Sequence, residues 1–152
     1  MELRRVVITG IGAITPIGNT APEYWDNLCK GVSGAGKITR FDSTKLKTHI
    51  ACEIKGYDSE AYFDRKESRK LDLYAQYAIV AADEAIKDSR IDKGNTDFDE
   101  VGVVFASGIG GISSLYYDMM DTDWNGEALR LSPFIIPRLL PDLASGHISI
   151  KH

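Results

Sequence analysis

The chain has 152 residues, of which 43% are hydrophobic and 26% charged, the length and composition of one globular domain. Its formal net charge of −4 argues against a nucleic-acid-binding protein, although it leaves room for a local basic patch. No apolar run is long enough to cross a membrane, and the amino terminus lacks the apolar core and cleavage site of an export signal, so we expect a cytoplasmic protein.

Residues 4–10 form an apolar run that is typical of a buried parallel strand, and the glycines Gly10 and Gly12 come at its end. A dinucleotide-binding fingerprint would need a third glycine where Thr15 stands, and Pro16 follows where its helix would continue. The pattern therefore predicts a strand that ends in a tight, close-packed turn.

A helix is predicted over residues 20–30. Thr20 and Glu23 have the spacing of a capping box, Pro22 stands near the first helical position, and Gly31 stands where a helix C-cap belongs. An apolar stripe at helical spacing consists of Trp25, Leu28 and Cys29.

The stretch "GVSGAGKIT", residues 31–39, has the glycine-to-lysine spacing of a phosphate-binding loop. The residue after Lys37 is Ile38, so the hydroxyl that would hold magnesium is missing. The loop also leaves a helix, whereas an anion-binding glycine loop leads from a strand into a helix. We expect a plain connecting loop.

Residues 41–65 are expected to be irregular, with a short strand within 48–54. One long helix is predicted over 67–88 because apolar residues recur there at steps of three and four. A polar turn over 92–100 then leads to a second buried strand over 101–107. The apolar stripe of the long helix consists of Leu71, Tyr74, Ala75, Ala78, Ile79, Ala82 and Ile86.

The stretch "DTDWNG", residues 121–126, begins like a calcium loop, but Ser132 stands where a bidentate carboxylate is required, so a polar turn is expected. The two cysteines, Cys29 and Cys52, lie far apart without CxxC partners, which argues against a disulfide framework or a zinc site. The tail is expected to hold a short helix with Pro141 near its start and then an extended segment. The layout is α/β with an incomplete sheet.

Five blocks now carry a resemblance: "RRVVITGIGAITPIGN", "W..L..G.SG", "RKESRKLD..AQYA", "ASGIGG" and "SPFIIPRLLPDLASGHISI". In this order and spacing they resemble the amino-terminal part of β-ketoacyl-acyl-carrier-protein synthases, most closely the synthase II group. The resemblance implies that residues 1–152 are part of a thiolase-like ketosynthase domain, in which helices and a mixed sheet are layered, and that the complete enzyme is a homodimer.

The resemblance also implies a decarboxylating Claisen condensation without a cofactor or metal. The family uses a cysteine nucleophile, two histidines and a supporting lysine, all of which lie beyond the segment that matches this chain. We therefore expect no catalytic residue among these 152. Cys29, Cys52, His147 and His152 do not match the family's catalytic positions and are expected to be structural.

Lys66, Arg69 and Lys70 share a helical face and match family residues that contact the acidic acyl carrier protein, with Arg130 as a weaker candidate. Basic residues at the start of a long helix would oppose its dipole, and carrier docking would explain why they are there. The alternative is a solvated charged face.

Ile109 matches the residue that gates the acyl pocket in the family, and Ile135 and Ile136 match residues that line the acyl pocket of the partner subunit. The alternative for all three is ordinary core packing. Two other functions stay open: a polyketide ketosynthase or its chain-length partner, and a truncated interaction module without activity.

Overall fold

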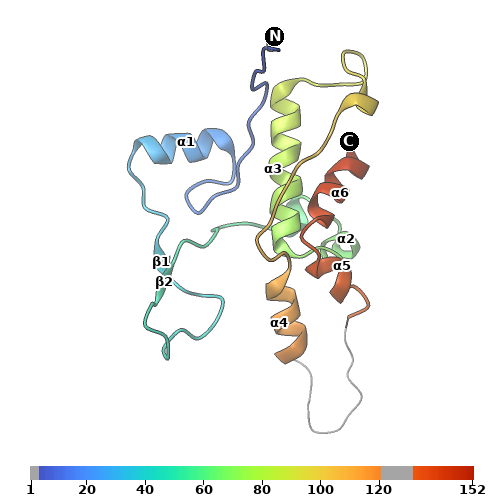
Figure 1. Cartoon of the computed structure of the whole chain (residues 1–152). Helices are drawn as coiled ribbons and strands as arrows, with labels where there is room; N and C mark the ends of the chain where they lie inside the picture. The colour runs from blue at the N-terminus through green and yellow to red at the C-terminus, as the bar shows by residue number, and fades with distance from the viewer. Residues whose placement is uncertain (1–3, 121–131) are drawn as a thin grey trace. The chain divides into compact units, whose positions relative to one another are not determined.

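The computed structural model describes residues 4–120 and 132–152, which fall into two compact units (Figure 1). One unit holds the described residues up to Tyr57 together with Asp83–Asp92. The other holds the described residues of Asp58–Ala82 and Lys93–His152. No helix in the described ranges has both the length and the apolar character that a membrane span needs.

Helix α1 (Ala21–Cys29) opens the first unit where the sequence predicts it. The Thr20 hydroxyl accepts a hydrogen bond from the Glu23 amide at 3.3 Å, and the Glu23 carboxylate accepts one from the Asn19 amide at 2.8 Å. At the other end, the Gly31 amide donates to Leu28 and the next amide donates to Asn27, each at 3.0 Å, while Gly31 takes a φ of 68°. This left-handed glycine cap ends the helix and confirms that the glycine loop leaves a helix.

The loop then forms a two-stranded antiparallel sheet. Strand β1 (Gly36–Lys37) pairs with β2 (Ile50–Ala51), with Gly36 opposite Ala51 and Lys37 opposite Ile50. The short strand predicted within 48–54 is therefore confirmed. Because β1 lies inside the "GVSGAGKIT" stretch, this segment pairs with a strand instead of opening a phosphate-binding helix.

The amino-terminal segment lies on the last part of helix α3 (Leu73–Ser89). A Cβ on Gly10 would be 2.1 Å from the Ala85 carbonyl oxygen, so only glycine fits at this approach. A tight turn follows, in which Thr15 and Gly18 exchange backbone hydrogen bonds of 2.8 and 3.3 Å. The predicted close-packed turn is confirmed.

The long helix predicted over 67–88 is wrong in one respect, because the structure divides it into α2 (Arg65–Ser68) and α3. The Asp64 carboxylate caps α2 by accepting from two backbone amides at 2.7 Å. The Asp72 carboxylate accepts from the Tyr74 amide at 3.0 Å and starts α3 in the same way. Each aspartate therefore starts its own helix, and the helical region is interrupted at residues 69–72.

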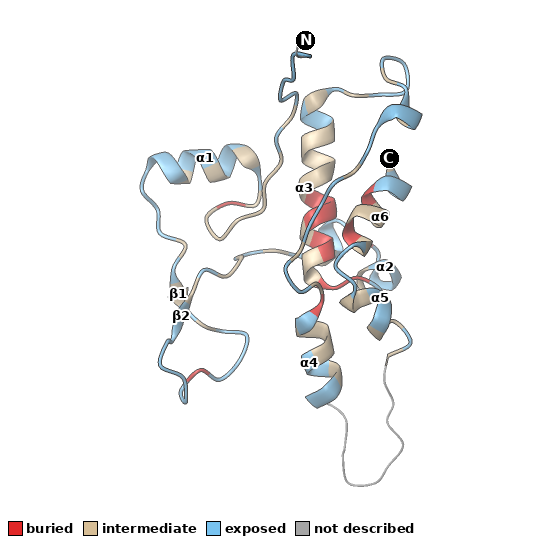
Figure 2. Cartoon of the chain, in the orientation of Figure 1, coloured by how far each residue is buried: buried red, intermediate tan, exposed pale blue. Residues whose placement is uncertain are grey.

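The second unit is built on the first part of α3, and Figure 2 shows its buried residues gathered there and on α6 (Leu143–Lys151). The predicted apolar stripe supplies half of this core, through Leu71, Ala75, Ala78 and Ile79. The buried apolar residues of the unit are Phe63, Leu71, Ala75, Ala78, Ile79, Val80, Ala144 and Ile148. This core therefore joins residues of α3 and α6 with Phe63 and Leu71, which lie outside both helices.

The remaining helices of this unit are α4 (Ile112–Met120) and α5 (Ile135–Leu139), which are packed together. Two short 3-10 turns, η1 (Ser59–Ala61) and η2 (Phe98–Glu100), lie in the loops. The extended end expected for the tail is wrong, because α6 continues to Lys151. Ala144 and Ile148, four residues apart and both buried, hold this face of the helix in the core.

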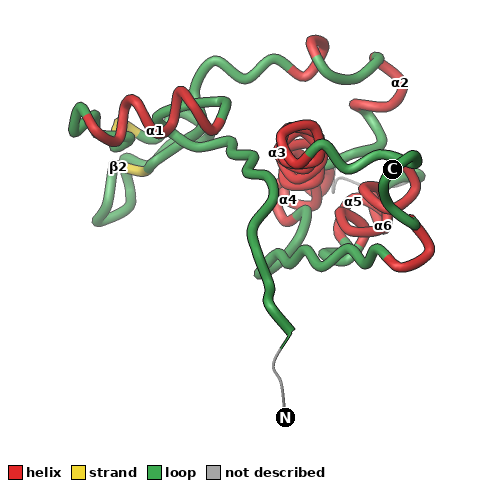
Figure 3. Tube along the Cα trace, turned by 90° about the horizontal axis from the view of Figure 1, so that it is seen from above, coloured by secondary structure: helices red, strands yellow, loops and turns green. Residues whose placement is uncertain are grey.

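The strands predicted over 4–10 and 101–107 are also wrong for the described chain, where both segments run as loops (Figure 3). Most of their side chains are exposed, with Val6 at 90%, Ile8 at 85% and Val104 at 99%. A strand needs a hydrogen-bonded neighbour, and neither segment has one among the described residues. The apolar pattern indicates that these side chains favour burial. Whether the segment forms a strand depends on a second segment that can pair with it.

Candidate functional site: a basic segment and a glycine turn joined through helix α5

The basic segment, which consists of Lys66, Arg69 and Lys70, lies at the end of α2 and not at the start of a long helix. Lys66 is in the last turn of α2, Arg69 is its C-cap residue, and Lys70 follows directly. Cations near a helix C-terminus interact favourably with its dipole, so this placement corrects our expectation of an opposed dipole. All three side chains are exposed.

Neighbouring side chains fix the backbone of this segment. Gln76, which is buried, donates from Nε2 to the carbonyl oxygens of Ser68 at 3.2 Å and Leu71 at 3.3 Å. The guanidinium of Arg138, on α5, donates to the Arg69 carbonyl oxygen. The Lys70 ammonium lies 5.9 Å from the centre of the Phe134 ring. The cationic side chains are therefore exposed on a backbone that is held in place.

The glycine turn over residues 107–111 lies against the carboxyl end of α5. A Cβ on Gly111 would be 2.0 Å from the Arg138 carbonyl oxygen, and one on Gly110 would be 2.1 Å from that of Leu139. Gly110 also has a φ of +74°, which favours glycine. The Gly111 amide donates to the Leu139 carbonyl oxygen at 3.2 Å, so the turn covers a carbonyl at the helix end.

Ile109 lies in this turn with 64% of its surface exposed. The turn lies on α5, whose first two residues are Ile135, which is half-buried, and Ile136, which is 59% exposed. The structure thus brings the turn that carries Ile109 onto the helix that carries the other two. Exposure at Ile109 and Ile136 disfavours the alternative that they are core residues of the described chain.

Arg138 lies at the centre of this arrangement, although no pattern in the sequence indicates a role for it. Its side chain reaches the basic segment, its own carbonyl oxygen faces the glycine turn, and its Nη1 lies 3.8 Å from Asp118 of α4. One short helix therefore connects both predicted surfaces. Arg130, the weaker carrier-binding candidate, lies outside the described residues, as does the "DTDWNG" stretch.

Asp72 is a second residue that the sequence analysis did not select. It is buried, with 5% of its surface exposed, and it accepts hydrogen bonds from the Ser114 amide at 3.2 Å and the Ser114 hydroxyl at 2.6 Å in addition to that from Tyr74. Burial, and then the negative charges of Asp72 and Asp142, raise the pKa of Tyr74. An aspartate directly before a helical pattern is a helix-start signal, and this signal could have revealed the break before α3.

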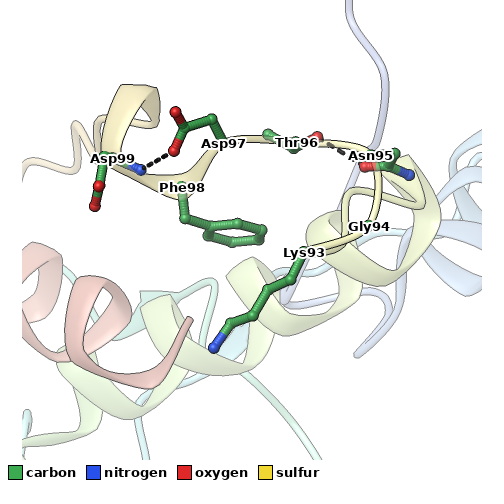
Figure 4. A pocket seen from close by; sticks show the side chains of 7 residues that line it. All are labelled: Lys93, Gly94, Asn95, Thr96, Asp97, Phe98 and Asp99. Carbon is green, nitrogen blue, oxygen red and sulfur yellow. Dashed lines mark hydrogen bonds between the residues drawn. The ribbon is translucent and has the colours of Figure 1, made fainter.

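Outside this arrangement, the described residues show a hollow but no group of metal ligands. A hollow of about 690 Å³ is lined by residues 93–99, and Figure 4 shows that Lys93 and Phe98 extend to the same side of this single loop. None of the predicted site residues lines it. In the described ranges no three His, Cys, Asp or Glu side chains form a metal-ligand group. Cys29 and Cys52 are free and exposed, so the expectation that they are structural finds no support in burial.

Comparisons with known proteins agree with the sequence pattern. The family described as "Beta-ketoacyl synthase, N-terminal domain" matches residues 3–152. The 3-oxoacyl-[acyl-carrier-protein] synthase 2 of Staphylococcus aureus (strain N315) is 45% identical over 97% of this chain and 35% of its own length. The protein of the same name from Synechocystis is 39% identical over 99% of this chain and 36% of its own.

Two solved structures show the fold. The ishigamide ketosynthase/chain length factor is 27% identical, with a TM-score of 0.78 over 97% of this chain and 36% of that one. A type II PKS ketosynthase, solved in complex with its acyl-carrier protein, is 23% identical, with a TM-score of 0.73 over 95% of this chain and 38% of that one.

The class of protein follows from the family match over nearly the whole chain and the ketosynthase fold of its structural neighbours. This chain belongs to the β-ketoacyl synthase family and has the fold of its amino-terminal domain. It spans about a third of the length of the curated relatives it matches.

Proposed function

We propose that this chain is the amino-terminal part of a β-ketoacyl-acyl-carrier-protein synthase of fatty-acid elongation. The observation that carries the proposal is the 45% identity to a 3-oxoacyl-[acyl-carrier-protein] synthase 2 across 97% of the chain. Residues 1–152 would belong to one ketosynthase domain, working in the cytoplasm as a homodimer. Sedimentation of the full-length protein tests the dimer.

The reaction would join two acyl groups with loss of carbon dioxide. An enzyme thiolate takes the acyl chain from its carrier, malonyl-carrier loses CO₂ to give an enolate, and the enolate carbon attacks the acyl-enzyme carbonyl. A carbon–carbon bond forms, the carbon–sulfur bond breaks, and the thiolate is released. The residues of this chain would bind and select the acyl carrier, while the reacting groups would come from the part of the relatives that this chain does not span.

The direct test of this function is elongation of an acyl carrier substrate by the full-length protein. We expect one two-carbon extension for each malonyl-carrier consumed, seen by mass spectrometry of the carrier-bound product. An absence of extension with any acyl primer would overturn the proposal.

Lys66, Arg69 and Lys70 would bind the acidic carrier, with Arg130 contributing to the same surface. Their ammonium and guanidinium groups are exposed, and the backbone beneath Arg69 and Lys70 is fixed. Triple reversal to glutamate should weaken carrier binding, and the effect should be largest at about 10 mM salt, where the Debye length is about 30 Å instead of about 8 Å. Reversal of the exposed loop residues Lys45, Lys47 and Lys55, which changes the net charge by the same amount, is the matched control. Equal carrier affinity of the triple variant and the control at low salt would exclude this surface.

Ile109 would control entry of the growing acyl chain, and Ile135 and Ile136 would line the pocket of the partner subunit. The exposure of Ile109 and Ile136 supports this role, since neither has a place in the core of the described chain. Ile109→Phe should reduce kcat/KM for long primers more than for short ones. Ile50→Phe, at an equally exposed isoleucine of β2, is the control. A uniform loss for all primers would contradict the gating role.

The second candidate is a polyketide ketosynthase or chain length factor, and the structural likeness at 27% identity favours it. The two functions differ in the number of condensations made on one enzyme before a product leaves. A product that has been extended several times without reduction would favour the polyketide function, whereas a single extension would favour fatty-acid elongation.

A further inference from the structure

Asp72 is a buried carboxylate at which two helix starts meet. Its Oδ1 accepts a hydrogen bond from the Tyr74 amide at 3.0 Å, in the first turn of α3. Its Oδ2 accepts from the Ser114 amide at 3.2 Å and from the Ser114 hydroxyl at 2.6 Å, in the first turn of α4. Because amides at a helix start lack partners within the helix, one carboxylate here satisfies donors of two helices.

The contact with α4 fixes one end of the glycine turn. Helix α4 begins directly after Gly111, and a Cβ on Gly111 would be 3.1 Å from the Asp72 Cβ. On the opposite side, the Gly111 amide donates to the Leu139 carbonyl oxygen of α5. At its other end the turn is closed by the Ser107 hydroxyl, which accepts from the Gly110 amide at 3.0 Å.

Ile109 lies between these fixed points. Its side chain is 64% exposed, so packing against neighbours does little to hold it. Its position is therefore set by the backbone of the turn, which in turn depends on where α4 begins. Among the contacts that fix the start of α4, the pair of hydrogen bonds to Asp72 is the one made by a buried charged group.

We propose that Asp72, acting through Ser114, is a positioning residue that holds the 107–111 turn and so sets the acyl-length selectivity exerted by Ile109. The inference rests on the proposed function, in which Ile109 controls acyl entry. Asp72 itself would touch neither the acyl chain nor the reacting atoms. Breaking the contact would loosen the turn, and discrimination between acyl lengths would decrease.

The test compares Asp72→Asn and Ser114→Ala in the full-length protein, with Ser113→Ala as the matched control on the same helix turn. The measured quantity is the ratio of kcat/KM for a short and a long acyl primer. Loss of one or two hydrogen bonds should move this ratio toward unity by about 3- to 10-fold in both test variants. Ser113→Ala should leave the ratio unchanged, and Ser114→Thr, which keeps the hydroxyl, should restore it.

A second comparison separates positioning from general destabilisation. In an Ile109→Gly background the gating side chain is absent, so Ser114→Ala should no longer alter the ratio. An alteration as large as in the native background would overturn the inference. Ser114→Ala also carries the test should Asp72→Asn fail to fold, because the serine is half-buried and its loss leaves the carboxylate cap of α3 intact.

Failure of the positioning role and failure of the proposed function give different results. If Ile109→Phe changes the acyl-length profile while Asp72→Asn and Ser114→Ala do not, the positioning role is wrong and the proposed function stands. If the native protein extends no acyl primer, the proposed function is wrong and the inference falls with it, even where hydrogen exchange shows that the Ser114 amide loses protection in Asp72→Asn.

Discussion

The segment at Gly10 and the turn at Gly111 both lie very close to a helix, but different groups hold them there. In each, a glycine approaches a helix so closely that an added Cβ would be about 2 Å from a carbonyl oxygen, that of Ala85 for Gly10 and that of Arg138 for Gly111. The sequence around Gly10 resembles part of a dinucleotide-binding loop, yet in the structure the missing side chain allows close contact with a helix, as it does at Gly111. A glycine cluster can therefore indicate a packing contact as well as an anion site.

The difference lies in what holds each turn on its helix. The segment after Gly10 is held by acidic side chains of α3: Glu84 accepts from the Ala13 and Ala21 amides at 2.9 Å, and Asp88 accepts from the Ile11 amide at 3.0 Å. The turn at Gly111 is held by backbone contact with α5 and by a buried carboxylate. Acidic side chains that are exposed or half-buried can adjust when the backbone shifts, so we expect the first segment to tolerate change better than the second.

Gly111→Ala should have the largest effect. The methyl group would lie 2.0 Å from the Arg138 carbonyl oxygen and 2.7 Å from its carbon, and neither a helix carbonyl nor the buried Gly111 can move away easily. We expect a loss of about 3 kcal/mol or more in the free energy of unfolding of the full-length protein, measured by denaturant titration. Gly108→Ala, at a site with no atom within 4 Å, should change it by less than about 1 kcal/mol. Similar values for both variants would refute the rigid contact.

Gly10→Ala should have a smaller effect although its geometry is equally tight. The added methyl group would lie 2.1 Å from the Ala85 carbonyl oxygen and 2.6 Å from the Ser89 amide nitrogen. The segment before it is exposed and can shift outward, so we expect about 1–2 kcal/mol in the same titration. Hydrogen exchange should show faster exchange of the Ile11 amide. A loss as large as that of Gly111→Ala would remove the difference between the two turns.

Local patterns in the sequence predicted much of this structure. The capped helix before Gly31, the short strand within 48–54 and the apolar stripe of α3 all follow from rules that act over a few residues. The break between α2 and α3 was missed because the apolar period runs through it. The Asp72 carboxylate starts α3 by accepting from the Tyr74 amide, and it also binds Ser114, 42 residues away, a contact that no local pattern shows.

Contacts of long range also explain what could not be predicted at the candidate site. The predicted residues Lys66, Arg69, Lys70, Ile109, Ile135 and Ile136 are all in the described chain, but nothing in their spacing indicates that α5 joins their segments. Arg138 makes that connection by binding the Arg69 carbonyl oxygen, 69 residues away. The strands expected over 4–10 and 101–107 failed for a related reason, since hydropathy reports the need for burial and not the identity of the pairing segment.

Glu84→Gln tests the carboxylates that hold the first turn. The amide keeps one acceptor oxygen but loses the charge that strengthens the hydrogen bonds from Ala13 and Ala21. We expect a loss of about 1–2 kcal/mol in the free energy of unfolding and faster exchange of the Ala21 amide. The exposed Glu100→Gln is the control and should change stability by less than about 0.5 kcal/mol. No difference between the two would mean that the glycine contact alone holds the turn.

Tyr74→Phe should have the smallest effect, and it tests a further contact near the turn at Gly111. The Tyr74 hydroxyl donates to the Leu140 carbonyl oxygen, next to the end of α5 on which Gly110 and Gly111 lie. Loss of this hydrogen bond should cost about 0.5–1.5 kcal/mol at neutral pH, measured by the same titration.

The pH dependence of that loss identifies its cause. Burial, and then the charges of Asp72 and Asp142, raise the pKa of Tyr74 above its ordinary value of 10.0. The unfolded chain therefore releases the tyrosine proton at a lower pH than the folded protein does. The stabilisation by Tyr74 is fully present below pH 10.0 and is lost as the pH rises through the folded-state pKa, because the phenolate is disfavoured by burial and has no proton to donate to Leu140. The difference in unfolding free energy between the native protein and Tyr74→Phe should therefore shrink as the pH rises above 10.0. A constant difference would show that the ring, and not the hydroxyl, supports the end of α5.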